Sequence, residues 1–194
     1  MRHLFGLLVA TSLMACAAAP APHPAVGAFI APGIFFATPR PQELGYRVEA
    51  VQLVTASYRG ERFVFEAHIS ASPERITLVS IDSLGRRALS ATRSSDTLTY
   101  EAADWVPREL RAENILVDLA LVYWPEQAIR AGLEGSAATL IARGNERSIV
   151  AGGREIVHVD YEASAVPDPW AGKSRLRNEA FGYALELRSA RVTR

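Results

Sequence analysis

The longest helical pattern in the chain runs from Pro107 to Leu133. Its apolar side chains recur at spacings of three and four, which predicts a helix buried over most of its surface. Pro125 interrupts the pattern, so a second, shorter helix is expected to start there and to end near Gly132 and Gly135. The apolar stripe of the first helix comprises Leu110, Ile115, Leu116, Leu119, Val122 and Tyr123, widened by Leu121 and Trp124.

On both sides of this segment the apolar positions alternate with polar ones, as in half-buried strands. Short polar or glycine-containing turns separate the runs. A helix so apolar must be covered, and a concave sheet covers more of it than a flat one. The predicted fold class is therefore mainly β (α+β), with a curled antiparallel sheet, a half-open barrel, wrapped around a central helical segment. The predicted strands are residues 46–58, 62–70, 76–81, 88–93, 97–102, 137–142, 146–152, 154–163, 175–178 and 183–190.

The first residues have the pattern of an export signal. Arg2 precedes an apolar run, Leu4 to Met14, that is too short to span a bilayer. The run ends in Leu13-Met14-Ala15-Cys16, which resembles a bacterial lipobox. We expect residues 1–15 to be a lipoprotein signal peptide and Cys16 to be lipidated with acyl chains such as palmitate. The alternative is a plain signal peptide cleaved within the following alanines.

Cysteine usage agrees with lipidation, since Cys16 is the only cysteine and no disulfide can form within the chain. Residues 16–44 are rich in proline and alanine and are expected to be a tether, part of whose apolar stretch 29–37 docks on the domain. Residues 45–194 are expected to form one folded domain.

Charge and motifs exclude several functions. The 21 basic and 21 acidic residues leave no surplus to neutralise phosphates, so no nucleic-acid partner is expected. No sequence motif of a catalytic, phosphate-binding or metal site occurs. His68 and His158 fall on polar strand faces, and Asp118 is expected at a helix edge, facing solvent or an arginine. The sequence thus predicts no catalytic residue, no cofactor and no metal, and we expect a protein that is not an enzyme.

The apolar residues expected on the concave side form either a filled core or the lining of a cavity for acyl chains, because an apolar site needs shape and dryness more than polar groups. The sequence leaves both possibilities open. These candidate lining residues are Phe63, Phe65, Ile76, Leu78, Leu89, Leu98, Tyr100, Leu116, Leu119 and Trp124.

The layout of lipobox, tether, strands, central helices and strands resembles LolB, the outer-membrane receptor that inserts lipoproteins, and its periplasmic relative LolA. Within LVSIDSLGRRALS at 78–90, Leu84 and Gly85 correspond to an exposed leucine and glycine in a LolB turn, with Asp82-Ser83 in place of asparagine-proline. The segment at 152–170 also resembles LolB. The resemblance implies a LolB-like half-barrel, a membrane- or donor-facing tip at Leu84 and Gly85, and a LolA-like periplasmic carrier as a partner.

The run at 117–133, with Trp170, Asn178 and Gly182-Tyr183, resembles a family of short bacterial lipoproteins often encoded with aryl-polyene pigment biosynthesis. With alanine after Cys16, enterobacterial-type sorting implies the periplasmic face of the outer membrane. The first hypothesis is a monomeric outer-membrane lipoprotein that binds an acyl or lipid chain and assists lipid or lipoprotein transfer to the membrane. The alternative is a non-catalytic structural lipoprotein with a filled core that docks a partner through a sheet edge or the Trp170 loop.

Overall fold

The computed structural model describes residues 26–95, 97–162 and 168–192 and is mostly β. The predicted signal peptide, Cys16 and the first part of the tether lie outside the described residues. A hairpin and a short 3-10 helix come first: β1 (Gly27–Ala31), β2 (Ile34–Ala37) and η1 (Pro41–Leu44). Five strands precede the helices: β3 (Val48–Tyr58), β4 (Glu61–Ala71), β5 (Arg75–Ile81), β6 (Arg87–Ser94) and β7 (Leu98–Ala102). The remaining elements are α1 (Ala112–Tyr123), α2 (Glu126–Gly132), β8 (Ala138–Arg143), β9 (Glu146–Ala151), β10 (Arg154–Tyr161), β11 (Gly172–Asn178) and β12 (Tyr183–Arg191).

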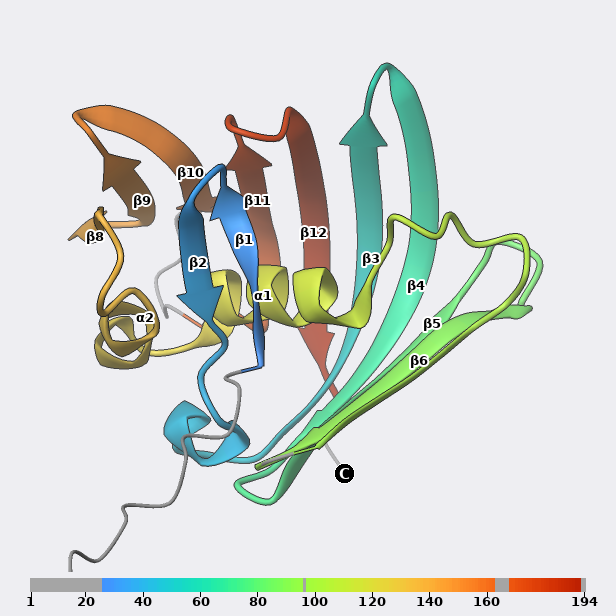
Figure 1. Cartoon of the computed structure of the whole chain (residues 1–194). Helices are drawn as coiled ribbons and strands as arrows, with labels where there is room; N and C mark the ends of the chain where they lie inside the picture. Colours follow the sequence, from blue (N-terminus) through green and yellow to red (C-terminus); the bar gives the residue numbers. More distant parts are fainter. Residues whose placement is uncertain (1–25, 96, 163–167, 193–194) are drawn as a thin grey trace, which may run out of the picture.

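Ten strands form one antiparallel sheet in the order β7-β6-β5-β4-β3-β12-β11-β10-β9-β8. The last strand, β12, pairs with the first strand of the sheet, β3, along its whole length, from Tyr183↔Tyr58 to Arg191↔Ala50. The two groups of strands on either side of the helices are therefore joined in the middle of the sheet. The sheet is not a closed barrel: it curves around α1, with β7 and β8 at its two edges (Figure 1).

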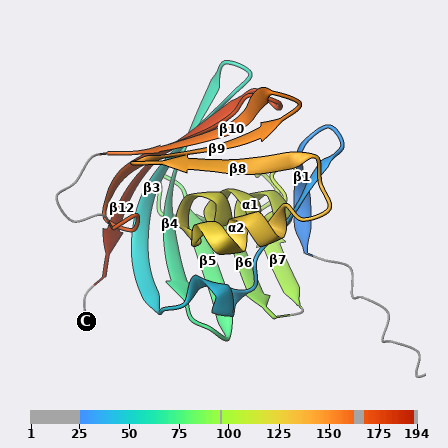
Figure 2. The ribbon, with the colours of Figure 1, turned by 90° about the vertical axis from the view of Figure 1, so that its left-hand side faces the viewer.

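Both helices lie inside the curve of the sheet (Figure 2). Each predicted strand overlaps a strand of the structure in the same order, and the helical segment divides at Pro125 as predicted. The helix does not begin at Pro107, however. Residues 103–111 form turns, in which the Leu110 N–H donates to the Pro107 carbonyl over 3.0 Å, and α1 begins only at Ala112. Arg111 at the N-cap makes no side-chain hydrogen bond to the first turn of the helix.

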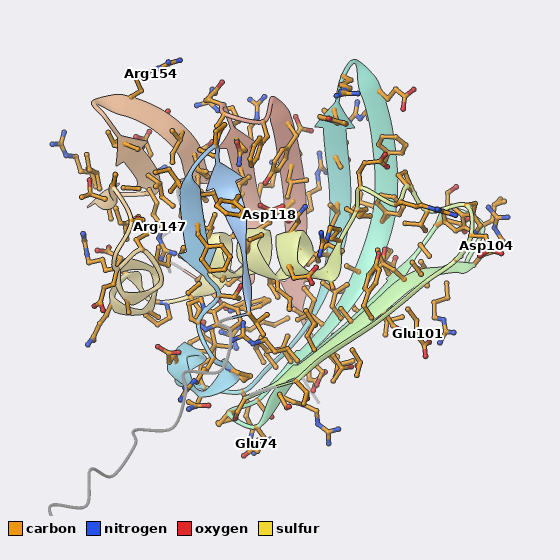
Figure 3. The ribbon with its side chains drawn as sticks, in the orientation of Figure 1. Glu74, Glu101, Asp104, Asp118, Arg147 and Arg154 are labelled. Carbon is orange, nitrogen blue, oxygen red and sulfur yellow. The ribbon has the colours of Figure 1, made fainter. Side chains whose placement is uncertain are left out.

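Arg147 and Tyr161 satisfy the carbonyl groups at the C-terminal end of α1. The Arg147 Nη1 donates to the Trp124 carbonyl over 2.8 Å, and the Tyr161 hydroxyl donates to the Val122 carbonyl over 2.5 Å. A guanidinium at this end also complements the partial negative charge of the helix dipole. Figure 3 labels Arg147 on the inner side of the molecule. Strands β9 and β10 thus hold the end of the helix.

The expected docking of part of the stretch 29–37 on the domain is confirmed, and residues 27–44 belong to the folded unit, which therefore begins before residue 45. The β1–β2 hairpin covers the side of α1 away from the sheet, and its Ile30 and Phe36 are 1% and 0% exposed. The Asn178 side-chain amide donates to the Ile30 carbonyl over 3.0 Å. The proline content suggested a tether, but burial of the hairpin's apolar side chains stabilises this segment on the helix.

Gly132 does not end α2 through a left-handed conformation; Gly135 has φ = +78° instead. A Cβ at Gly132 would lie 2.5 Å from the Ala37 carbonyl oxygen. Glycine at this position therefore lets α2 approach the backbone of the β1–β2 hairpin closely.

Candidate functional site

A cavity of about 120 Å³ lies between α1 and the inner faces of β3, β4, β5, β6 and β12, partly open to the surface. Most of its wall is aliphatic or aromatic. The lining residues are Gln52, Val54, Ala56, Phe65, Ala67, Leu78, Ser80, Leu89, Leu110, Ile115, Asp118, Leu119, Tyr123, Leu185 and Leu187.

The cavity exists because small side chains occupy the centre of the concave face. Ala56 on β3 and Ala67 on β4 face α1 between larger neighbours such as Phe65. On the helix, the lining residues Ile115, Leu119 and the intervening Asp118 recur at helical spacing, so one stripe of α1 faces the space. Short side chains opposite this stripe leave a gap that the helix does not fill.

Four of the ten residues predicted to line a cavity do so: Phe65, Leu78, Leu89 and Leu119. Ile76, Leu116 and Trp124 are instead buried outside the cavity. The β1–β2 hairpin covers other faces of the helix and makes a core there. The Trp124 indole N–H donates to the Arg40 carbonyl over 3.3 Å.

The remaining three predicted residues are half-buried and lie outside the lining: Phe63, Leu98 and Tyr100. The Tyr100 hydroxyl donates to the Leu110 carbonyl over 2.6 Å, so Tyr100 positions a lining residue without lining the cavity itself.

Sequence reasoning missed the polar part of the wall. The Gln52 amide donates to the Tyr123 hydroxyl over 2.5 Å and to the Ser189 hydroxyl over 3.2 Å, and the two hydroxyls are 2.9 Å apart. Burial raises the pKa of Tyr123, although the Ser189 hydrogen bond acts in the opposite direction. A glutamine on a strand gives no sequence signal for an inward position.

Trp170 packs beneath this polar group rather than in an exposed loop. Its ring stacks on Tyr123 with centroids 3.9 Å apart, its indole N–H donates to the Tyr46 hydroxyl over 2.9 Å, and its side chain is 0% exposed. Trp170 is therefore a core residue, while docking through the loop that carries it, part of which lies outside the described residues, stays a prediction. Stacking and burial of two large aromatic rings stabilise the fold more than their exposure to solvent would.

Asp118 is not at an edge facing solvent or an arginine. The Tyr183 hydroxyl donates to Asp118 Oδ1 over 2.7 Å, and the carboxyl lies inside the curve of the sheet (Figure 3). Asp118 has an intermediate exposed fraction, but the surface that it exposes is the cavity wall. Burial raises the pKa of Asp118 to about 7, while the Tyr183 hydrogen bond acts in the opposite direction. The helix orientation that puts Leu119 in the cavity puts Asp118 there too.

Leu84 lies at the end of the β5–β6 hairpin and is 76% exposed. Asp82 Oδ1 accepts hydrogen bonds from the N–H groups of Leu84 and Arg86, both over 2.9 Å, and Gly85 has φ = +76°. Burial alone would raise the pKa of Asp82, but the hydrogen bonds from Arg86 and Leu84 hold that pKa below its ordinary value. The turn is therefore fixed in a shape that projects the leucine.

A second exposed apolar residue lies beside this tip. The Arg86 guanidinium is 5.0 Å from the ring centroid of Trp105, which is 44% exposed. Asp104, next to Trp105, is seen in Figure 3 at the end of the β5–β6 hairpin. Nothing in the sequence around Trp105 indicated this neighbour, because the loop approaches the tip only in the folded chain.

The two strand histidines do not face the cavity. His68 Nε2 is 2.8 Å from Glu66 on the outer face of β4, and His158 Nδ1 is 3.1 Å from both Ser148 and Glu155 on the outer side of β10 and β9. Among the described residues, no group of three or more acidic, histidine or cysteine side chains could hold a metal ion. None of the helices in the described ranges is long and apolar enough to cross a membrane.

These features define a curved open sheet that encloses helices and an apolar cavity. Residues 49–191, from β3 to β12, match the model of a family described as "Protein of unknown function (DUF3261)". The chain therefore belongs to the DUF3261 family. No curated protein matches it.

Proposed function

We propose that this protein is an outer-membrane lipoprotein that binds an acyl or lipid chain in the cavity beneath α1. In this proposal it assists transfer of a lipid or a lipoprotein to the membrane, as the resemblance to LolB and LolA implies. The lipobox at Cys16 supports the anchor, and a LolA-like carrier is the proposed donor. The observation that carries the proposal is the cavity, whose lining is mostly apolar.

The size of the cavity agrees with a chain-like ligand. Its volume of about 120 Å³ is close to that of engineered apolar cavities, ~150 Å³, that stay dry and bind benzene. It therefore accommodates a short segment of an acyl chain, and the remainder extends through the open side. Leaving such a space empty costs stability, so a function that needs the space explains why the core does not fill it.

The tip supports transfer as well as binding. Strands β5 and β6 carry Leu78 and Leu89 in the cavity wall and Leu84 at the hairpin end. Leu84 is exposed on the same hairpin that forms the wall, and the exposed Trp105, from the loop after β7, lies against Arg86 of that hairpin end. Exposed apolar side chains of this kind favour contact with a membrane or with a donor's acyl chain.

One observation favours the structural alternative. Within the described residues, no strand pairs with the outer edges of β7 and β8. An open edge can accept a strand from a partner protein. This alternative makes no use of the cavity, so filling the cavity distinguishes the two functions.

The test is displacement of a fluorescent acyl probe by wild type and by Ala67→Leu. The substitution adds three carbon atoms to the cavity wall, so probe affinity should fall at least about tenfold, or ~1.4 kcal/mol. Because filling a cavity often stabilises a protein, by ~0.5–2 kcal/mol, the melting temperature should be unchanged or higher. Ala190→Leu, at an exposed position of β12, is the matched control and should bind the probe as wild type does. Unchanged binding by Ala67→Leu would contradict the proposal.

A further inference from the structure

Asp118 is the only acidic residue in the cavity wall. Among the described residues that line the cavity there is no arginine, lysine or histidine to balance it. The Tyr183 hydroxyl donates to its Oδ1 over 2.7 Å. A carboxyl group in an apolar wall is unfavourable unless it is protonated or paired, so this position is unusual for a site that only has to hold hydrocarbon.

Two of the other polar groups of the wall, Gln52 and Tyr123, are already engaged with each other. Gln52 donates to both Tyr123 and Ser189, and the two hydroxyls are within hydrogen-bond distance of each other. Asp118, in contrast, accepts one hydrogen bond through Oδ1 and retains acceptor capacity on its carboxyl group. Ser80 is the remaining polar side chain of the wall, and a carboxylate accepts more strongly than its hydroxyl, so Asp118 is the group best able to receive a donor from a ligand.

We propose that the ligand of the cavity is a single-chain amphiphile whose polar end is a hydrogen-bond donor, an ammonium or hydroxyl group, held by Asp118. This inference rests on the proposed binding of an acyl chain and specifies its chemical class. A fatty acid is disfavoured, because its carboxylate would meet a like charge in a poorly solvated space.

The charge of the bound ligand determines whether the carboxyl group of Asp118 is protonated. The pKa of Asp118 is already raised to about 7 by burial. An ammonium group favours the ionised carboxylate, so binding releases to solvent the proton that part of the Asp118 population carries near neutral pH. A hydroxyl group donates to the carboxyl oxygen in either state and therefore releases far less. Tyr183 and Tyr123 are the other titratable groups of this region, and burial is the largest cause of the raised pKa of each.

The experiment compares dodecylamine, dodecanol and laurate, below their micellar concentrations, as competitors of a fluorescent acyl probe at pH 8. For the wild-type protein, dodecylamine should compete at least about tenfold better than laurate, corresponding to ~1.4 kcal/mol. Asp118→Asn keeps the size and the Tyr183 hydrogen bond but not the charge, and should reduce this preference to about twofold. Asp160→Asn, on the face of β10 opposite Val159, is the control for loss of one carboxylate and should keep the wild-type preference.

Equal competition by all three compounds would overturn this inference but not the proposed binding of an acyl chain. An unchanged preference of Asp118→Asn for dodecylamine over laurate would do the same. Failure of all three compounds to displace the probe would overturn the proposed function together with the inference. Calorimetry of the wild-type protein in buffers of different ionisation enthalpy gives a second readout that needs no variant. Near pH 7, proton release on binding dodecylamine but not dodecanol is expected, and no release with either compound contradicts the role of Asp118.

Discussion

Asp118 brings a carboxyl group into a wall that is mostly apolar, so its protonation is linked to folding. Its pKa is raised to about 7 in the folded state by burial, against about 3.9 in an unfolded chain. Between about pH 4 and pH 7 the folded state holds a proton that the unfolded state has lost. The contribution of Asp118 to stability therefore falls as the pH rises through this interval and levels off above it.

Asp118→Asn should remove that part of the pH dependence. Relative to wild type, we expect the variant to gain stability between pH 4 and pH 8, by on the order of 4 kcal/mol. Urea unfolding of both proteins across this range measures the difference, and Asp160→Asn serves as the matched control. A stability difference that does not change with pH would show that Asp118 is not desolvated in the folded state.

A substitution at the exposed Leu84 should change function without changing stability. Because its side chain is 76% exposed, Leu84→Glu should lower the free energy of unfolding by about 0.5 kcal/mol or less. If the tip enters a bilayer or contacts a donor's acyl chain, the same change should reduce transfer of a fluorescent lipid between vesicles by at least about tenfold, ~1.4 kcal/mol.

The matched control for the tip is Leu53→Glu, which makes the same change at a 45% exposed leucine of β3, away from the hairpin end. It should leave transfer as in wild type. A large drop in melting temperature for Leu84→Glu would mean that the leucine supports the fold, and unchanged transfer would mean that the tip has no part in function.

At the scale of elements, the type and order of the strands and helices could be predicted from the sequence. Each strand alternates or is bounded by a turn, and the helix carries apolar residues at helical spacing, so local patterns contain this information. The β1–β2 hairpin was not predicted as a pair of strands, because the prolines in and around it suggested a tether. Its strands are short, and only burial of Ile30 and Phe36 against the helix makes them stable.

The rotation of α1 about its axis could not be predicted in the same way. The helix is apolar on nearly all sides, so its pattern does not say which stripe faces the sheet and which faces the hairpin. That rotation decides that Leu119 and Asp118 line the cavity while Leu116 and Trp124 do not. The inward position of Gln52 depends on strand pairing and on its bond to Tyr123, which only the folded chain brings together.

At the scale of the whole molecule, the fold combines an apolar cavity wall, an opening of that cavity to the surface and an exposed tip at Leu84. The sheet stays open because β7 and β8 do not meet, and it curves around α1 (Figure 2). A cavity remains between α1 and the strands that include β3 and β4. Such a molecule can hold a chain between helix and sheet and expose apolar side chains at one end. The central claim is that a lipid chain occupies this space.

Native mass spectrometry of the protein, released from membranes by mild detergent extraction, tests this claim most directly. We expect the wild-type protein to carry a noncovalent adduct with the mass of a single lipid or amphiphile. Ala67→Leu should carry much less of the adduct, and Ala190→Leu should carry as much as wild type. Wild-type protein without any adduct, or an adduct of equal abundance in Ala67→Leu, would contradict the account.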